Sequence, residues 1–257
     1  MREERYRAKF GHRGRGWAYL ERLVGGVAED IEVRLAQRQR VRVLELGCGF
    51  GTALLDLRER FGDRVELHGL NRERNDGDAD VMRRTLRDRQ SSGGNGAGEA
   101  DLPSIAYADI AHGVPFADRS FDVVYSQVAW LYFGNKVGVV QEVMRVLDEG
   151  GVARIDADEL RGGLPLEYAR LVEIWQEGSI LPFRDYAGRH GVALTPAGEG
   201  EYLHFGKQRS FGEDLEPVLE IDLSTVHPEW DGIKCVYRVR SPQVPPPGLP
   251  AGSDRGR

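Results

Sequence analysis

Three glycines at alternate positions are the residues of this chain best suited to hold a ligand. They are Gly47, Gly49 and Gly51 in the stretch VRVLELGCGFGTALLDL over 41–57. Glycine adopts positive φ angles and lets a ligand approach the backbone, and the first free N–H groups of a following helix face the same loop. Because an apolar run precedes the glycines and a helical pattern follows them, the sequence predicts a strand, a ligand-binding loop and a helix.

The spacing of this loop and a neighbouring carboxylate argue against a dinucleotide. A pyrophosphate site needs G-x-G-x-x-G, whereas here the third glycine comes one residue early and Thr52 stands in its place. Glu45 lies two residues before the first glycine. A carboxylate repels a pyrophosphate and attracts an ammonium or sulfonium group, so we expect a small polar ligand that carries such a cation. A plain glycine-rich turn is the alternative.

Bulk properties exclude several classes of protein. With 257 residues, 40% of them hydrophobic, the chain can bury one large core. A net charge of −6 does not favour nucleic acid as a partner. The two cysteines offer neither a disulfide framework nor a metal cluster, which fits a reducing cytoplasm. With no apolar leader and no run of ~20 apolar residues, we expect a cytoplasmic protein that does not enter a membrane.

Strand-like and helix-like patterns alternate along the chain. Strands are predicted at 41–46, 65–70, 105–109, 121–127 and 152–157. Helices are predicted at 52–61, 78–89, 135–148 and 165–176, with Gly150 and Gly151 capping the third. This alternation indicates an α/β fold with a doubly wound, mostly parallel sheet, and the late β-structure indicates an antiparallel C-terminal hairpin.

The predicted organisation is a single domain over 1–241. Residues 1–40 form an N-terminal helical cap in this interpretation. The segment 88–104 is small, polar and glycine-rich, which predicts a flexible insertion. The proline- and glycine-rich tail over 242–257 is predicted to be disordered.

Several motifs in order resemble one family. They are VLELGCGFG, LHGLN, YADIAHGVPFADRSFDVVYSQ and VMRVLDEGGVARID, within residues 41–157. Together they resemble class I S-adenosylmethionine-dependent methyltransferases of the small-molecule type. The resemblance implies a Rossmann-like sheet, S-adenosyl-L-methionine as the cofactor and methyl transfer to a small molecule. It further implies that Gly47, Gly49 and Gly51 wrap the methionine part and ribose edge of the cofactor, with Glu45 near its amino group, directly or through water.

Three further positions carry over from the same resemblance. Asp109 is expected to accept a hydrogen bond from the exocyclic amine of the adenine, and Ile110 to pack on its ring. Gln127 lies where the family contacts the cofactor and admits substrate. The simpler alternatives are a turn cap for Asp109 and a surface polar residue for Gln127.

Asn71 departs from the family pattern. In most members an aspartate or glutamate ends the second strand and takes both ribose hydroxyls. An asparagine keeps one acceptor and adds a donor, so a charge-assisted bond of ~1.5–3 kcal/mol becomes a neutral one of ~0.5–1.5 kcal/mol. This interpretation predicts that Asn71→Asp tightens cofactor binding or leaves it unchanged.

Two alternative functions stay open. Asn71 followed by Arg72 is what an NADP-dependent oxidoreductase would show. Tyr132 and Lys136 have the Tyr-x-x-x-Lys spacing of short-chain reductases, but Gly134 and Asn135 interrupt the helix that such a pair would share. A protein that binds S-adenosylmethionine without catalysis is the second alternative, because no general base stands out.

Candidate bases and substrate-facing residues follow the fourth and fifth predicted strands. The candidate bases are His112, Tyr132, Asp156, Asp158 and Glu159. The three carboxylates among them lack further ligands for Mg²⁺, so we expect no metal and assign no catalytic residue. Aromatic residues in the regions that cover the pocket in the resembled family favour an apolar or aromatic small molecule, with an ordinary core as the alternative. They are Trp17, Tyr19, Trp130, Tyr132, Phe133, Trp175 and Phe183.

Overall fold

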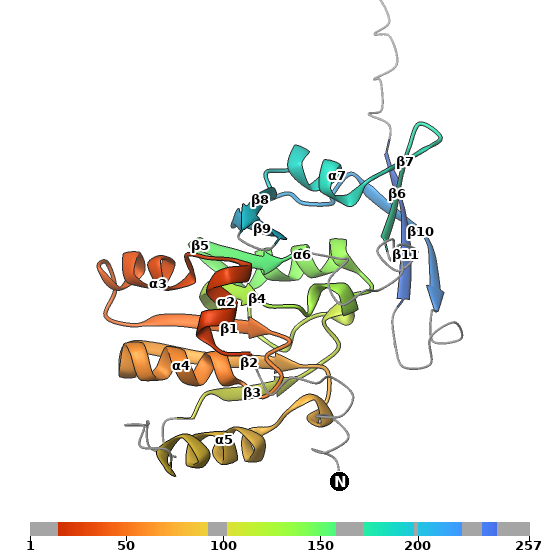
Figure 1. Ribbon diagram of the computed structural model, residues 1–257. Helices are drawn as coiled ribbons and strands as arrows, with labels where there is room; N and C mark the ends of the chain where they lie inside the picture. Colours follow the sequence, from red (N-terminus) through yellow and green to blue (C-terminus); the bar gives the residue numbers. More distant parts are fainter. Residues whose placement is uncertain (1–14, 92–101, 158–171, 198–199, 223–232, 241–257) are drawn as a thin grey trace, which may run out of the picture.

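A seven-stranded sheet runs through the centre of the protein (Figure 1). The computed structural model describes residues 15–91, 102–157, 172–197, 200–222 and 233–240. In order across the sheet the strands are β3 (Ser104–Tyr107), β2 (Val65–Asn71), β1 (Val41–Leu46), β4 (Phe121–Ser126), β5 (Leu147–Asp156), β9 (Gly200–Gly206) and β8 (Ala193–Ala197). The first five pair in parallel, whereas β9 pairs antiparallel with β5 and β8. The predicted α/β fold, with a mostly parallel sheet and an antiparallel C-terminal hairpin, is confirmed.

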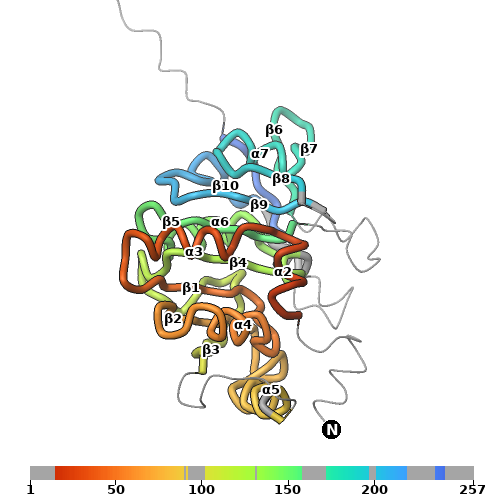
Figure 2. The backbone as a smooth tube through the Cα atoms, turned by 60° about the vertical axis from the view of Figure 1, so that its left-hand side comes forward, coloured from red at the N-terminus to blue at the C-terminus, as the bar shows by residue number. Residues whose placement is uncertain are grey.

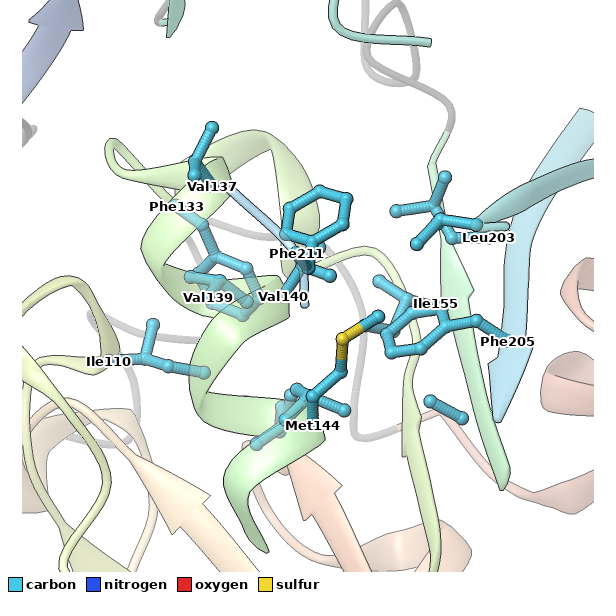
Figure 3. Close-up of a cluster of buried hydrophobic side chains, with 14 of the residues drawn as sticks. Ile110, Phe133, Val137, Val139, Val140, Met144, Ile155, Leu203, Phe205 and Phe211 are labelled. Carbon is cyan, nitrogen blue, oxygen red and sulfur yellow. The ribbon is translucent and has the colours of Figure 1, made fainter. Parts of the chain in front are cut away.

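Alternate residues of the strands bury opposite faces of this sheet. Val41 and Val43 of β1 pack under α2 (Trp17–Leu23), α3 (Val27–Leu35) and α4 (Thr52–Phe61). Leu44 and Leu46 belong to a second core around α6 (Lys136–Val146). Figure 3 shows the side chains of this second core on and beside α6. Helices α4 and α6 therefore cover opposite faces.

A second, four-stranded sheet packs on the core around α6. Its order is β10 (Leu215–Asp222), β11 (Ile233–Val239), β6 (Val172–Gln176) and β7 (Ser179–Leu181), with α7 (Phe183–Arg189) beside it (Figure 2). Val172, Ile174, Cys235 and Tyr237 contribute buried side chains to the same core. The single domain over 1–241 stays a prediction, and the tail lies outside the described residues.

The predicted helix over 165–176 is wrong for residues 172–176, which form β6. Val172 and Ile174 are buried while Trp175 is exposed, so the local pattern is the two-residue repeat of a strand. Residues 165–171 lie outside the described part of the chain.

Two boundaries also differ from the prediction. Helix α6 ends at Val146, because Leu147 is already extended and pairs with Phe121. Gly150 and Gly151 therefore lie inside β5, where the register with β4 shifts, and do not cap the helix. Helix α5 (Ala79–Ser91) continues into the segment predicted as a flexible insertion, of which 92–101 lie outside the described residues.

Among the described residues, no helix combines the length and the apolar character needed to cross a bilayer.

Candidate cofactor-binding site

The loops that follow β1 and β4 meet at the carboxyl edge of the central sheet. These two strands are adjacent and parallel, and the helices that follow them cover opposite faces of the sheet. A Cβ atom built on Gly47 would lie 2.4 Å from the Cβ of Ala129, so the two loops are in direct contact. Open α/β sheets bind their ligands at such a switch point. The glycine loop therefore lies where a ligand is expected.

The backbone of the loop requires its glycines. Gly47, Gly49 and Gly51 have φ angles of 69°, 52° and 68°, which favour glycine. A Cβ on Gly51 would lie 2.2 Å from Cε of Met82 in α5. The N–H groups of Gly47 and Cys48 donate to the Leu70 carbonyl at 2.7 and 3.1 Å, which joins the loop to the end of β2. The predicted strand, loop and helix are confirmed.

Glu45 is fully buried beside the end of β4. Its carboxylate accepts hydrogen bonds from Nε2 of Gln127 at 2.8 Å and from the hydroxyl of Tyr125 at 3.2 Å. Burial raises the pKa of Glu45 to about 8, and these two bonds offset only part of the rise. None of the described basic side chains forms an ion pair with this carboxylate. The site therefore presents a buried carboxyl group whose charged form lacks a cation.

Gln127 presents a second incompletely satisfied group at the same place. It is 7% exposed, and its Nε2 donates to Glu45 and to the backbone carbonyl of Arg15. Its Oε1 is buried and has no hydrogen-bond partner among the residues that the structure describes. A buried acceptor of this kind needs a donor. Gln127 is therefore not the surface residue of the simpler alternative, and its side chain lies against Glu45.

The residue after Gln127 is held in a strained backbone conformation. Val128 has φ 61°, which is an outlier for a β-branched residue. Its N–H donates to Oδ2 of Asp156, a carboxylate that is 1% exposed at the end of β5. Strain of this kind persists only where surrounding contacts enforce it, and it clusters at functional sites. Asp156 thus supports the loop that follows β4.

Asn71 ends β2 with its amide turned toward the glycine loop. Its Oδ1 accepts from the N–H of Gly49 at 2.8 Å, and its Nδ2 donates to the carbonyls of Gly49 and Gly77 at 2.9 and 3.0 Å. The side chain is 2% exposed. The expected contact with ribose hydroxyls stays a prediction, and it would compete with these bonds.

Asp109 and Ile110 follow β3, which ends at Tyr107 and not at residue 109 as predicted. Oδ1 of Asp109 accepts from the N–H of Ala111 at 2.9 Å, so this residue caps the short 3-10 helix Ile110–His112. Its Oδ2 lies 3.6 Å from Nδ1 of His112. Ile110 is 6% exposed and packs in the core around α6. The capping role is thus present, and the adenine contacts of both residues stay predictions.

The candidate bases differ in their surroundings. His112 and Tyr132 are largely exposed, whereas Asp156 is buried and bonded to Val128. Asp158 and Glu159 lie outside the described residues. The described residues contain no group of three or more His, Cys, Asp or Glu side chains placed to hold a metal ion. Lys136 begins α6 behind the cap Asn135, so it does not share a helix with Tyr132.

The aromatic residues divide between core and surface. Trp130 and Phe133 are buried and meet edge to face, with ring centroids 6.2 Å apart, and the ring centroid of Phe183 lies 5.5 Å from that of Trp130. Tyr132 and Trp175 are exposed. The core interpretation therefore holds for Trp130 and Phe133, and the substrate-covering role of the others stays a prediction.

Sequence reasoning missed three participants in this site. Tyr125 pairs with Glu45 in the parallel register of β1 and β4, a neighbour that strand pairing could have indicated. Gly77 has φ 152°, and its place in the polar turn NDGD was a signal for an unusual backbone. The carbonyl of Arg15 accepts from Gln127 without any signal in the sequence.

The central part of this chain is similar in sequence to known proteins. Residues 44–155 match the family model described as "Methyltransferase domain". The sterol 4-C-methyltransferase strm-1 of Caenorhabditis elegans is 29% identical over 136 residues, which are 51% of this chain and 35% of that protein. The glycine/sarcosine/dimethylglycine N-methyltransferase of Actinopolyspora halophila is 29% identical over 131 residues, which are 51% of this chain and 20% of that protein. The chain thus spans about a third or less of the length of these relatives.

A solved structure of a SAM-dependent methyltransferase from Aquifex aeolicus covers 72% of this chain and 92% of its own, with a TM-score of 0.45 and 14% identity. The family match runs from β1 to β5, the strands that carry the glycine loop, Asn71, Asp109 and Gln127. Residues 44–155 of this chain are therefore similar to the methyltransferase domain family.

Proposed function

We propose that the protein binds S-adenosyl-L-methionine at the glycine loop and transfers its methyl group to a small organic molecule. One observation carries this proposal. The glycine loop, the buried carboxyl of Glu45 and the unsatisfied Oε1 of Gln127 meet at the switch point of a domain that matches methyltransferases.

The residues at this point fit the cofactor's chemistry. An ammonium group beside Glu45 would compensate the buried charge and would supply the N–H donor that Oε1 of Gln127 lacks. Gly49 has no side chain and a positive φ, so a ligand can approach the backbone of the loop there. Asp109 and Ile110 lie after β3, where we propose that the adenine binds.

The bound cofactor would supply an electrophilic methyl group on a sulfonium. The protein itself would hold the acceptor atom, the methyl carbon and the sulfur in line. Such positioning can lower the barrier without a covalent bond to the protein. Val128 and Asp156 fix the loop after β4, where the acceptor would enter. The described residues single out no general base, so we propose a reaction driven by position and orientation.

The names of the relatives support a small-molecule acceptor. One relative is named for methylation of a sterol at carbon and another for methylation of glycine, sarcosine and dimethylglycine at nitrogen. We propose a small organic molecule as the substrate of this chain, with the acceptor atom open between oxygen, nitrogen and carbon.

Calorimetric titration with S-adenosylmethionine, S-adenosylhomocysteine and NADPH tests the proposal. We expect saturable binding of both adenosyl sulfur compounds and none of NADPH. Gly49→Val should abolish binding, because valine is strained at φ 52° and covers the loop. Gly62→Val is the matched control, since Gly62 has φ 58° and open space where a Cβ would lie. Binding of NADPH alone would contradict the proposal and favour the oxidoreductase alternative.

A further inference from the structure

We infer that Asn71 is a positioning residue, which holds the glycine loop against the turn after β2 and acts on cofactor binding through Gly49. This inference rests on the proposed function, because the loop it positions is the proposed cofactor site. It assigns to Asn71 a role other than contact with the ribose.

The hydrogen bonds of Asn71 use the whole capacity of its amide. An asparagine side chain offers two N–H donors and one oxygen with two lone pairs. Both donors are engaged, one by the carbonyl of Gly49 at 2.9 Å and one by that of Gly77 at 3.0 Å. The oxygen accepts from the N–H of Gly49 at 2.8 Å and lies 3.4 Å from Sγ of Cys48. No donor or acceptor remains for a ligand while these bonds persist.

The amide bridges two pieces of backbone that touch one another. A Cβ built on Gly77 would lie only 2.0 Å from the carbonyl oxygen of Gly49, so the turn and the loop are in close contact there. Nδ2 of Asn71 donates to the carbonyls of both glycines. Without these bonds, each of the two carbonyl oxygens would lose a hydrogen-bond donor. The loop conformation therefore depends on a donor at this position.

An aspartate at position 71 would reverse this effect. It preserves the acceptor for the N–H of Gly49 but replaces the donor with an anionic oxygen that faces two carbonyls. The contact becomes repulsive, and the loop loses its support. If Asn71 instead contacted the ribose directly, the carboxylate would strengthen that bond. The two roles thus predict opposite changes in affinity.

The experiment measures the dissociation constant of S-adenosylhomocysteine for wild type, Asn71→Asp and Asn135→Asp by calorimetry between pH 5.5 and 8. We expect Asn71→Asp to bind about 10-fold or more weakly at pH 8, the loss of two bonds. The ratio to wild type should shrink toward pH 5.5, because a protonated carboxyl regains one donor. A purely structural defect would not recover in this way.

Asn135→Asp is the matched control. Its Oδ1 accepts from Gly138 N–H and from the hydroxyl of Tyr237, roles that an aspartate retains. The substitution removes only the long 3.5 Å bond from Nδ2 to the Ala111 carbonyl, so binding should change by less than about 2-fold. Equal or tighter binding by Asn71→Asp at pH 8 would overturn the inference while the proposed function stands. Failure of wild type to bind would contradict the proposed function itself.

Amide hydrogen exchange of the wild type decides the matter even if the variant fails to fold. The Gly49 N–H should be protected in the free protein, because it donates to Asn71. Rapid exchange at Gly49 alongside protected strands would show that the bond does not persist, and would overturn the inference.

Discussion

The buried carboxylates at the two ends of strands β1 and β4 have opposite surroundings. At the amino edge, Asp122 is the second residue of β4 and pairs with Arg38 and Arg42. At the carboxyl edge, the partners of Glu45 within the described part of the chain are the neutral Tyr125 and Gln127. The same sheet therefore stabilises a charge at one edge and disfavours it at the other.

Arginines pair with two carboxylates at the amino edge, the buried Asp122 and the partly exposed Asp148. The backbone N–H of Arg42 donates to Oδ2 of Asp122 at 2.8 Å, and its guanidinium bonds both Asp122 and Asp148. Arg38 adds a bond to each carboxylate. Burial raises the pKa of Asp148, but bonds from the Glu149 amide and the arginines outweigh it and hold the pKa at about 2. These charges are matched within the chain.

At the carboxyl edge, the described residues supply no cation to match the carboxylate of Glu45. Burial raises the pKa of Glu45 to about 8, and Oε1 of Gln127 has no partner among the described residues. Val128 adds backbone strain beside them. A perturbed pKa and backbone strain at one place favour a binding role for the carboxyl edge, whereas matched charge at the opposite edge favours a structural role.

Removal of the Asp122 carboxylate should produce the largest loss of stability. Asp122 is 2% exposed, and Asp122→Ala leaves the bonds of Arg42 and Arg38 incomplete. We expect the free energy of unfolding to fall by about 3 kcal/mol in urea titrations at pH 7. The dissociation constant for S-adenosylhomocysteine should stay within about 2-fold of wild type, because the substitution lies at the far edge.

Asp63→Ala is the control for this substitution. Asp63 is largely exposed and pairs with Arg58 at 3.6 Å, so its loss should cost less than about 0.5 kcal/mol. If Asp122→Ala and Asp63→Ala lowered the free energy of unfolding equally, the buried ion pair would contribute no more than the surface pair.

Glu45→Gln should stabilise the protein at high pH. The folded protein keeps a proton on Glu45 that the unfolded chain releases, so the wild-type free energy of unfolding falls as the pH rises from about 4.5 to about 8. The amide has no proton to lose, so this part of the slope disappears. We expect a gain of at least ~2 kcal/mol at pH 8, measured by urea unfolding, and none near pH 4.5.

The same substitution should weaken the binding of S-adenosylhomocysteine, because an amide cannot pair with an ammonium group. Glu66→Gln is the matched control, since Glu66 lies on the neighbouring strand and is exposed. If the free energy of unfolding depended on pH in the same way for wild type and Glu45→Gln, Glu45 would already be ionised in the free protein. The carboxylates at the two edges would then not differ in charge.

Local sequence patterns predicted the central sheet because its signals lie within each strand. The run Val41 to Leu46 and the three glycines after it determine their own conformations, and both are confirmed. The helix predicted across 172–176 is wrong because apolar residues upstream extend a helical period into this strand. Short apolar runs do not separate the two periods.

The candidate site was predicted in position but not in its bonds. The residues at the ends of β1, β2 and β4 came together as the switch-point rule requires. The partners of Asn71 were not readable, because Gly77 reaches it only through the path of the chain after β2. The pKa of Glu45 depends on burial by elements from several parts of the chain, which no local motif encodes.

Asp148→Asn should show the smallest effect and the opposite dependence on pH from Glu45→Gln. Its pKa is lowered to about 2 from 3.8, so the carboxylate stabilises the fold above pH 3.8, and this contribution is lost as the pH falls toward 2. We expect Asp148→Asn to lower the free energy of unfolding by about 1–2 kcal/mol at pH 7, and that free energy should change less with pH below pH 4 than in the wild type. Urea unfolding across this pH range measures both. Glu149→Gln is the control, because Glu149 is exposed and pairs only with Arg119 among the described residues. A gain in stability from Asp148→Asn above pH 5, as expected for Glu45→Gln, would show that the arginines do not hold this carboxylate ionised. The amino edge would then contain an unmatched carboxyl group, as the carboxyl edge does.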